Sequence, residues 1–159
     1  MRGYPPAVIR IELTVEIACP PENVFAALTD LERLPEWQSS AVSSKADGPL
    51  AVGVRVREQR SMLGRELENE LEVTAYDTPR RFALEGRSGA IPLSIDHELV
   101  EEGGKTVLHV RAQAEPGGLF KLAEPMIKRT AEQELRADFE CLKDRLEAGG
   151  YPPQAAPVD

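Results

Sequence analysis

The transitions that decide the fold lie in the stretch VIRIELTVEIACPPENVFAALTDLERLPEW, residues 8–37. Apolar and polar residues alternate from Val8 to Ile17, which is the period-two pattern of a half-buried strand. Pro20 and Pro21 end this strand, and the residues after them are apolar at helical spacing. Pro35 must end or kink the second helical segment. The stretch therefore predicts one strand followed by two short helices.

After Ser39 the pattern returns to strands. In RELENELEVTAY, residues 65–76, apolar residues and one Asn alternate with four glutamates and a Thr, so one face is covered and the other is solvated. The acidic run is a strand face rather than a calcium site, because its carboxylates do not converge from a loop. Further strands are predicted over residues 80–86, 92–102 and 105–115, and the short turns between them indicate antiparallel hairpins.

One long amphipathic helix is predicted from Gly118, because apolar residues recur three or four apart as far as Leu146. An antiparallel sheet of about seven strands can bury its apolar face by wrapping around this helix, which gives a two-layer α+β domain. We expect this domain to span residues 8–148, with an N-terminal extension over residues 1–7 and a disordered C-terminal tail over residues 149–159.

The composition narrows the classes of function. A chain of 159 residues with 42% hydrophobic and 29% charged residues suits one globular domain. Its net charge of −8 argues against binding to nucleic acid, because phosphate contacts depend on Lys and Arg. The apolar runs are far shorter than the roughly 20 residues that cross a bilayer, and the N-terminal residues hold no apolar signal core. We therefore expect no stable membrane insertion and a cytoplasmic location.

Metal and cofactor sites have no support in the sequence. Cys19 and Cys141 lie far apart, and His97 and His109 have no cysteine at ligand spacing, so neither a disulfide framework nor a zinc site is indicated. Gly104-Lys105-Thr106 ends like a phosphate-binding loop, but the first glycine of that motif is absent. No motif for serine or cysteine catalysis is present. We expect no metal and no cofactor.

Four segments stand in the order found in one known superfamily: CPPENVFAALTDLERLPEW, YDTPRRFALEG, DHELVEEGGKTVLHV and PGGLFKLAEPMIKRTAEQELRADFECLKDRL. Through them, residues 8–147 resemble the START-like, or Bet-v-1-like (SRPBCC), superfamily, and within it the bacterial polyketide cyclase/dehydrase and lipid-transport family. The resemblance implies a helix-grip fold, with a cavity between sheet and long helix for a small hydrophobic or amphipathic molecule. It implies no single reaction, because relatives include cyclases, carriers, ligand sensors and regulators.

Glu58 and Arg60 are the polar candidates. They share a strand face with Val54 and Val56, so we predict that they point into the cavity. A buried Glu–Arg pair could orient a polar ligand group, and a desolvated Glu58 could act as a general base. The alternative is that both lie in water at the open end of the sheet, or that a bulge reverses their direction.

Three further polar residues are candidates. His97 shares a face with Leu99, whereas His109 faces outward, so His97 could bond a ligand or move a proton; the alternative is a core histidine with a structural partner. Asn69 has the same inward direction and could serve a ligand or a structural hydrogen bond. Thr130 could face the cavity or bond its own helix backbone.

Trp37 is the only tryptophan, and it follows the proline that breaks the second helix. It either seals the core or touches a ligand at the cavity mouth. Met126 and Leu122 are wall candidates that could equally be plain core. The full set of candidate ligand-binding residues is Trp37, Glu58, Arg60, Asn69, His97, Leu122, Met126 and Thr130.

Three functions follow from these residues. The first is a monomeric or homodimeric carrier or binding protein for a lipid-like or polyketide-like molecule. The second is an enzyme of the polyketide cyclase/dehydratase type, with Glu58, Arg60 or His97 as the proton relay. The third is a protein-interaction or stress-regulatory module that uses the acidic outer face.

Overall fold

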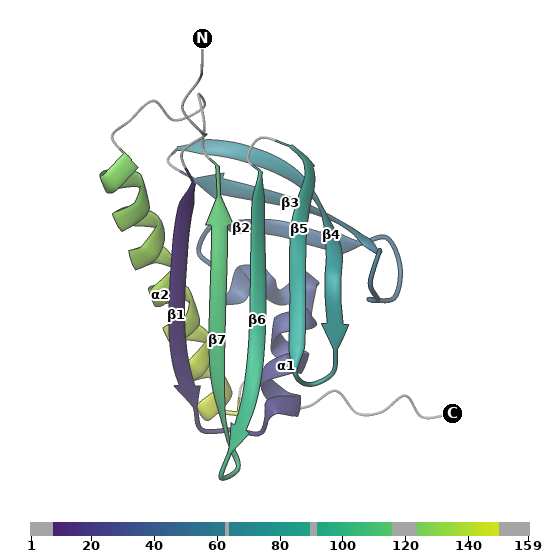
Figure 1. Cartoon of the computed structure of the whole chain (residues 1–159), viewed down its shortest axis with the longest axis vertical. Helices are drawn as coiled ribbons and strands as arrows, with labels where there is room; N and C mark the ends of the chain where they lie inside the picture. The colour runs from purple at the N-terminus through teal and green to yellow at the C-terminus, as the bar shows by residue number, and fades with distance from the viewer. Residues whose placement is uncertain (1–7, 63, 90–91, 116–123, 150–159) are drawn as a thin grey trace.

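The computed structural model describes residues 8–62, 64–89, 92–115 and 124–149 (Figure 1). In chain order the elements are β1 (Ile9–Ile17), α1 (Pro21–Thr29), the 3-10 helix η1 (Leu31–Glu36), β2 (Ala41–Ala46), β3 (Arg55–Met62), β4 (Arg65–Asp77), β5 (Arg81–Gly89), β6 (Leu93–Glu102), β7 (Lys105–Ala114) and α2 (Glu124–Glu147). The predicted order of strand, two short helices, meander and long helix is confirmed.

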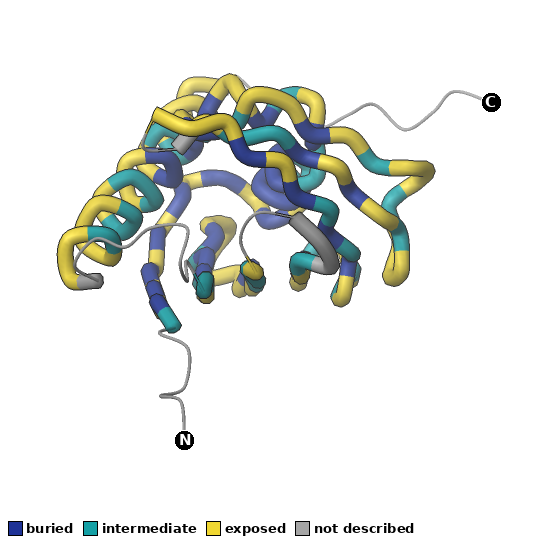
Figure 2. Tube along the Cα trace, turned by 90° about the horizontal axis from the view of Figure 1, so that it is seen from above, coloured by how far each residue is buried: buried dark blue, intermediate teal, exposed yellow. Residues whose placement is uncertain are grey.

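The strands form one antiparallel sheet in the order β1-β7-β6-β5-β4-β3-β2. The first two strands of the chain are thus the two edges of the sheet, and α1 and η1 carry the chain from one edge to the other. The sheet curves, and the buried residues gather on its inner side (Figure 2). Helix α2 packs against β1, and η1 packs against β2. This arrangement is the predicted α+β helix-grip fold.

The alternation read from the sequence places the side chains as expected on most strands. Along β1 every second residue is buried, and along β4 the glutamates stand on the more exposed face. A register shift between Val73 and Ala75 interrupts the alternation in β4. Beyond it the Tyr76 ring packs on Phe25, with ring centroids 5.5 Å apart. The sequence pattern had placed Ala75 on the inner face, and the bulge corrects that prediction, because one extra residue reverses the direction of those that follow.

Helix α2 has two differently packed halves. In its C-terminal half Phe139, Leu142 and Leu146 are buried in the core. The end of the helix is held by Glu147, whose carboxylate accepts the Ala18 N–H at 2.8 Å. Further toward the N-terminus the helix is only partly covered, and Met126 is 68% exposed. The C-terminal half therefore anchors the helix, while the other half is free to border a cavity.

A glycine follows the end of α2. Gly149 has a φ of 81°, the left-handed conformation that favours glycine just after a helix. The predicted N-terminal extension, the tail beyond Gly149 and the predicted first helical turns at residues 118–123 lie outside the described residues. Among the helices that are described, none is long and apolar enough to cross a membrane.

Candidate ligand-binding cavity

A cavity of about 210 Å³ lies between the concave face of the sheet, η1 and the partly covered half of α2. Most of its wall is apolar, and side chains from both layers contribute. The apolar wall includes Leu34, Leu71, Leu84, Ile127, Ala131 and Leu135. Such a space, with few polar groups on an apolar wall, is the usual form of a small-molecule site.

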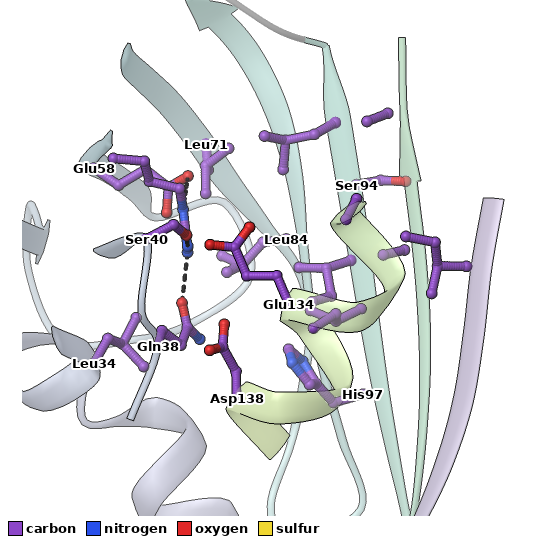
Figure 3. A pocket seen from close by; sticks show the side chains of 18 of the residues that line it. Leu34, Gln38, Ser40, Glu58, Leu71, Leu84, Ser94, His97, Glu134 and Asp138 are labelled. Carbon is purple, nitrogen blue, oxygen red and sulfur yellow. Dashed lines mark hydrogen bonds and ion pairs between the residues drawn. The ribbon is translucent and has the colours of Figure 1, made fainter. Parts of the chain in front are cut away.

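Arg60 is the centre of a polar cluster on this wall, and Figure 3 labels its partners Glu58, Ser40 and Gln38. Its Nε donates to Glu58 Oε1 at 2.9 Å, its Nη1 to Ser40 Oγ at 2.8 Å, and its Nη2 to Gln38 Oε1 at 2.7 Å. The Glu58 side chain is only 4% exposed and that of Arg60 19%. Both therefore face inward as a desolvated ion pair, and the alternative that they stand in water at the sheet's end is wrong.

Two more carboxylates project from α2 toward this cluster (Figure 3). Glu134 and Asp138 are one helical turn apart, and both line the cavity. Glu134 Oε1 accepts the Ser39 hydroxyl at 3.2 Å, and Asp138 Oδ1 accepts the Ser39 N–H at 3.0 Å. Burial raises the pKa of the Asp138 carboxyl above its ordinary value, and Glu134 adds to this, while the Ser39 hydrogen bonds and Arg60 oppose it.

His97 lies on the cavity wall, 4% exposed. Its Nδ1 is 2.9 Å from the Phe82 carbonyl oxygen, which can only accept, so Nδ1 carries the proton. Nε2 then presents a lone pair, and no group in the described part of the chain donates to it. Burial lowers the pKa of His97, and the Phe82 bond and Asp96 oppose this only in part. The imidazole is therefore a neutral acceptor on the wall.

Trp37 caps the end of η1 and lines the same cavity, 3% exposed. Its ring lies against Phe139, with centroids 5.2 Å apart, and Phe139 also contacts the His97 ring at 5.9 Å. The Trp37 indole N–H is buried without a partner among the described residues. Buried indoles usually find an acceptor, so this donor, the His97 acceptor and the Ser44 hydroxyl are three unmet hydrogen-bonding groups on residues of one wall.

Residues 8–147 match the family model described as polyketide cyclase / dehydrase and lipid transport. The chain belongs to this family.

Solved structures show how widely the fold of this family member is shared. A START superfamily protein from Mycobacterium smegmatis has 18% identity and a TM-score of 0.75, and the alignment covers 87% of this chain and 97% of that one. A protein from Thermus thermophilus has 18% identity and a TM-score of 0.73, with coverage of 88% and 98%. Ara h 8.0201 has 15% identity and a TM-score of 0.64, with coverage of 89% and 99%. No curated protein matches the chain.

Of the predicted site residues of this polyketide cyclase/dehydrase family member, Trp37, Glu58, Arg60 and His97 come together on the cavity wall. Asn69 is buried on β4 opposite Glu58 in the strand pairing, but the wall does not include it. Leu122 lies outside the described residues.

The two described residues of α2 that the sequence predicted as cavity lining each lie one position before a residue that does line the cavity. Met126 and Thr130 are exposed and do not line the cavity, whereas Ile127 and Ala131 do. An α-helix turns by about 100° per residue, so Met126 and Thr130 lie beside Ile127 and Ala131 on the helix surface, on the side turned to solvent. The sequence shows the apolar stripe but not the rotation of the helix against the sheet.

Sequence reasoning missed seven polar residues of the described wall: Gln38, Ser40, Ser44, Ser94, Gln113, Glu134 and Asp138. A signal exists for the two acids, since each directly precedes an apolar residue of the inward stripe, Leu135 or Phe139. Acids on the edge of an apolar stripe are commonly solvated, however, so the pattern alone does not single them out. Gln38 and Ser40 follow a helix end and show no periodicity that would assign them a side.

Proposed function

We propose that this protein is a carrier or binding protein for a small hydrophobic or amphipathic molecule, lipid-like or polyketide-like, held in the cavity between the sheet and α2. The observation that carries the proposal is that three residues of a largely apolar cavity wall, Trp37, Ser44 and His97, each carry a buried polar atom without a partner among the described residues. A buried polar atom without a partner costs about 1–3 kcal/mol. A ligand that bonds one of these atoms removes its cost on binding.

The apolar wall supplies the affinity in this proposal. Apolar surface withdrawn from water contributes about 25 cal/mol per Å², so a short alkyl chain or a ring is enough to hold a ligand. The polar groups contribute orientation, because they lie at defined places on the wall. The family's description, polyketide cyclase / dehydrase and lipid transport, is consistent with both classes of ligand.

A matched pair of variants tests the cavity as the binding site. Ala131 lines the cavity, and Ala137 is exposed on the same helix. We expect octan-1-ol to bind the wild type and Ala137→Phe saturably in isothermal titration calorimetry, and to bind Ala131→Phe at least about tenfold more weakly, because the new ring occupies the space. Trp37 is the only tryptophan, so its emission should change over the same titration.

Two results would contradict this proposal. Equal binding of octan-1-ol by Ala131→Phe and the wild type would place the binding elsewhere. Absence of saturable binding by the wild type, together with solvent extracts of the purified protein that contain no lipid-like or polyketide-like molecule, would remove the binding function itself.

The alternative is an enzyme of the cyclase/dehydratase type. It is favoured by one observation: a neutral His97 with a free lone pair faces the same cavity as the Glu58–Arg60 pair and Asp138. A base and a carboxyl group whose pKa burial raises, together in one desolvated site, are what removal of a proton and loss of water require. A binding protein returns its extracted ligand with unchanged mass after incubation, whereas this enzyme would return a dehydrated product.

A further inference from the structure

The charges on the cavity wall are unbalanced. Three carboxylates line it, those of Glu58, Glu134 and Asp138, and within the described part of the chain Arg60 is the only Lys or Arg on the wall. With all four groups ionised, the wall carries two more negative charges than positive ones. An anionic ligand entering this low-dielectric space would meet repulsion that water screens poorly.

Arg60 is poorly placed to offset this excess of negative charge for an anionic ligand. Its three hydrogen bonds, to Glu58, Ser40 and Gln38, use each of its nitrogens. Two of the five N–H groups of the guanidinium remain for a ligand, but its charge is already paired with the Glu58 carboxylate 2.9 Å away. A ligand anion that drew Arg60 away from Glu58 would leave that carboxylate buried without its partner, which is costly.

The carboxylates of α2 retain capacity to accept hydrogen bonds. Ser39 donates to one oxygen of Glu134 and one oxygen of Asp138. An ionised carboxylate can accept about four hydrogen bonds, so both groups can take further donors. These two side chains point toward the polar cluster from the opposite wall (Figure 3).

An independent observation also indicates a hydrogen-bond donor on the ligand. His97 Nε2 is an acceptor without a partner among the described residues, and His97, 4% exposed, lines the same cavity. A hydrogen-bond donor on the ligand is what would satisfy it. The Trp37 N–H differs, since it needs an acceptor, and a hydroxyl or ether oxygen elsewhere on the ligand would serve it.

We infer that the polar end of the ligand is a protonated amine, and that the cavity discriminates against carboxylate and phosphate. This inference rests on the proposed binding function and names its ligand class. An ammonium donates up to three hydrogen bonds and brings the positive charge that the wall lacks. It would also favour the ionised form of Asp138, whose pKa burial and Glu134 raise in the free protein.

Three probes with the same alkyl chain test the inference: octylamine, octan-1-ol and octanoate. At pH 7 the amine is positive and the acid negative, so the order of their affinities reports the sign of the net charge on the cavity wall. By calorimetry in buffer with physiological salt, we expect octylamine to bind about tenfold or more tightly than octanoate, with octan-1-ol between them.

A matched pair of double variants locates the origin of the preference. Glu134→Gln/Asp138→Asn removes the two cavity carboxylates of α2 and keeps oxygens that can accept from Ser39. Glu140→Gln/Asp144→Asn makes the same two changes at the same spacing on exposed positions of the same helix. We expect the first variant to lose most of the preference for octylamine and the second to keep it.

The outcomes are separable. If octan-1-ol binds, two results would overturn the inference and leave the proposed binding function intact. The first is that octanoate binds as tightly as octylamine. The second is that Glu134→Gln/Asp138→Asn keeps the full preference for octylamine. No binding of any of the three probes, together with solvent extracts that contain no lipid-like or polyketide-like molecule, overturns both. If the cavity variant does not fold, the ranking of the three probes on the wild type decides.

Discussion

Glu58 and Arg60 show how much a single strand face can reveal. Their spacing from Val54 and Val56 predicts that both point inward, and the structure confirms it. The partners of Arg60 on the η1–β2 connection, Gln38 and Ser40, were not predicted, because they lie about 20 residues away in sequence. A strand pattern reports direction, whereas the partner depends on which segment packs opposite.

Removing Arg60 should be much more harmful than removing an exposed arginine. Arg60→Met leaves the Glu58 carboxylate buried without a cation, so we expect the free energy of unfolding in urea to fall by about 3–5 kcal/mol. Glu58→Gln/Arg60→Met should recover most of this loss. The control is Arg80→Met, in an exposed pair with Asp77, where we expect a change of about 1 kcal/mol or less. If Arg60→Met lowers the free energy of unfolding as little as Arg80→Met does, the result would contradict the burial of the Glu58–Arg60 pair.

Trp37 was predicted either to seal the core or to touch a ligand, and its geometry is compatible with both. The ring packs on Phe139, which belongs to the core, and the indole N–H stays without a partner on the cavity wall. Its position after a proline-broken helix is visible in the sequence. Its orientation depends on α2, which is distant in the chain.

At the scale of elements, α2 divides into an anchoring half and a half that borders the cavity. The apolar stripe of the sequence runs through both halves without a change of pattern. Only the packing separates them: Leu142 is fully buried, while Leu135 is partly buried and lines the cavity. The difference arises because the C-terminal half is held at the β1–α1 corner by the bonds of Lys143 and Glu147.

Two identical substitutions on α2 should therefore have different effects. Leu142→Ala empties a fully buried position, and we expect a loss of about 2–5 kcal/mol in the free energy of unfolding with little change in octan-1-ol affinity. Leu135→Ala should cost about 1 kcal/mol and weaken octan-1-ol binding a few-fold, roughly the effect of one or two lost methylene contacts. Urea unfolding and calorimetry on both variants measure this. Equal stability losses would show that the two halves pack alike.

At the scale of the whole molecule, the buried titratable groups give the stability a dependence on pH. The folded pKa of His97 is lowered, so below its ordinary value of about 6.5 the unfolded chain binds a proton that the folded protein does not. His97 therefore makes the protein less stable as the pH falls through that value. Asp138 acts in the opposite sense: its folded pKa is raised, so its penalty on folding grows as the pH rises from its ordinary value toward that folded pKa.

The two histidines permit a matched test of the His97 contribution. We expect the free energy of unfolding of the wild type to fall between about pH 7.5 and pH 5.5, with His97 contributing at most about 1.4 kcal/mol per pH unit. His97→Gln should flatten this slope, and His109→Gln, on the outer face where it bonds Thr14, should leave it in place. An unchanged slope in His97→Gln would mean that the imidazole is charged or solvated in the folded state.

Local periodicity in the sequence determined the elements, the faces of the strands and the class of fold. Period-two and helical patterns depend only on near neighbours, so Ile9–Ile17, Arg65–Asp77 and the stripe ending at Leu146 can be read without the structure. The tertiary structure decided the rotation of α2 and the bulge after Val73. It also decided the polar cluster, in which Ser39 meets Asp138 across 99 residues. Contacts of that range depend on how separate elements pack, and no local pattern in the chain encodes their geometry.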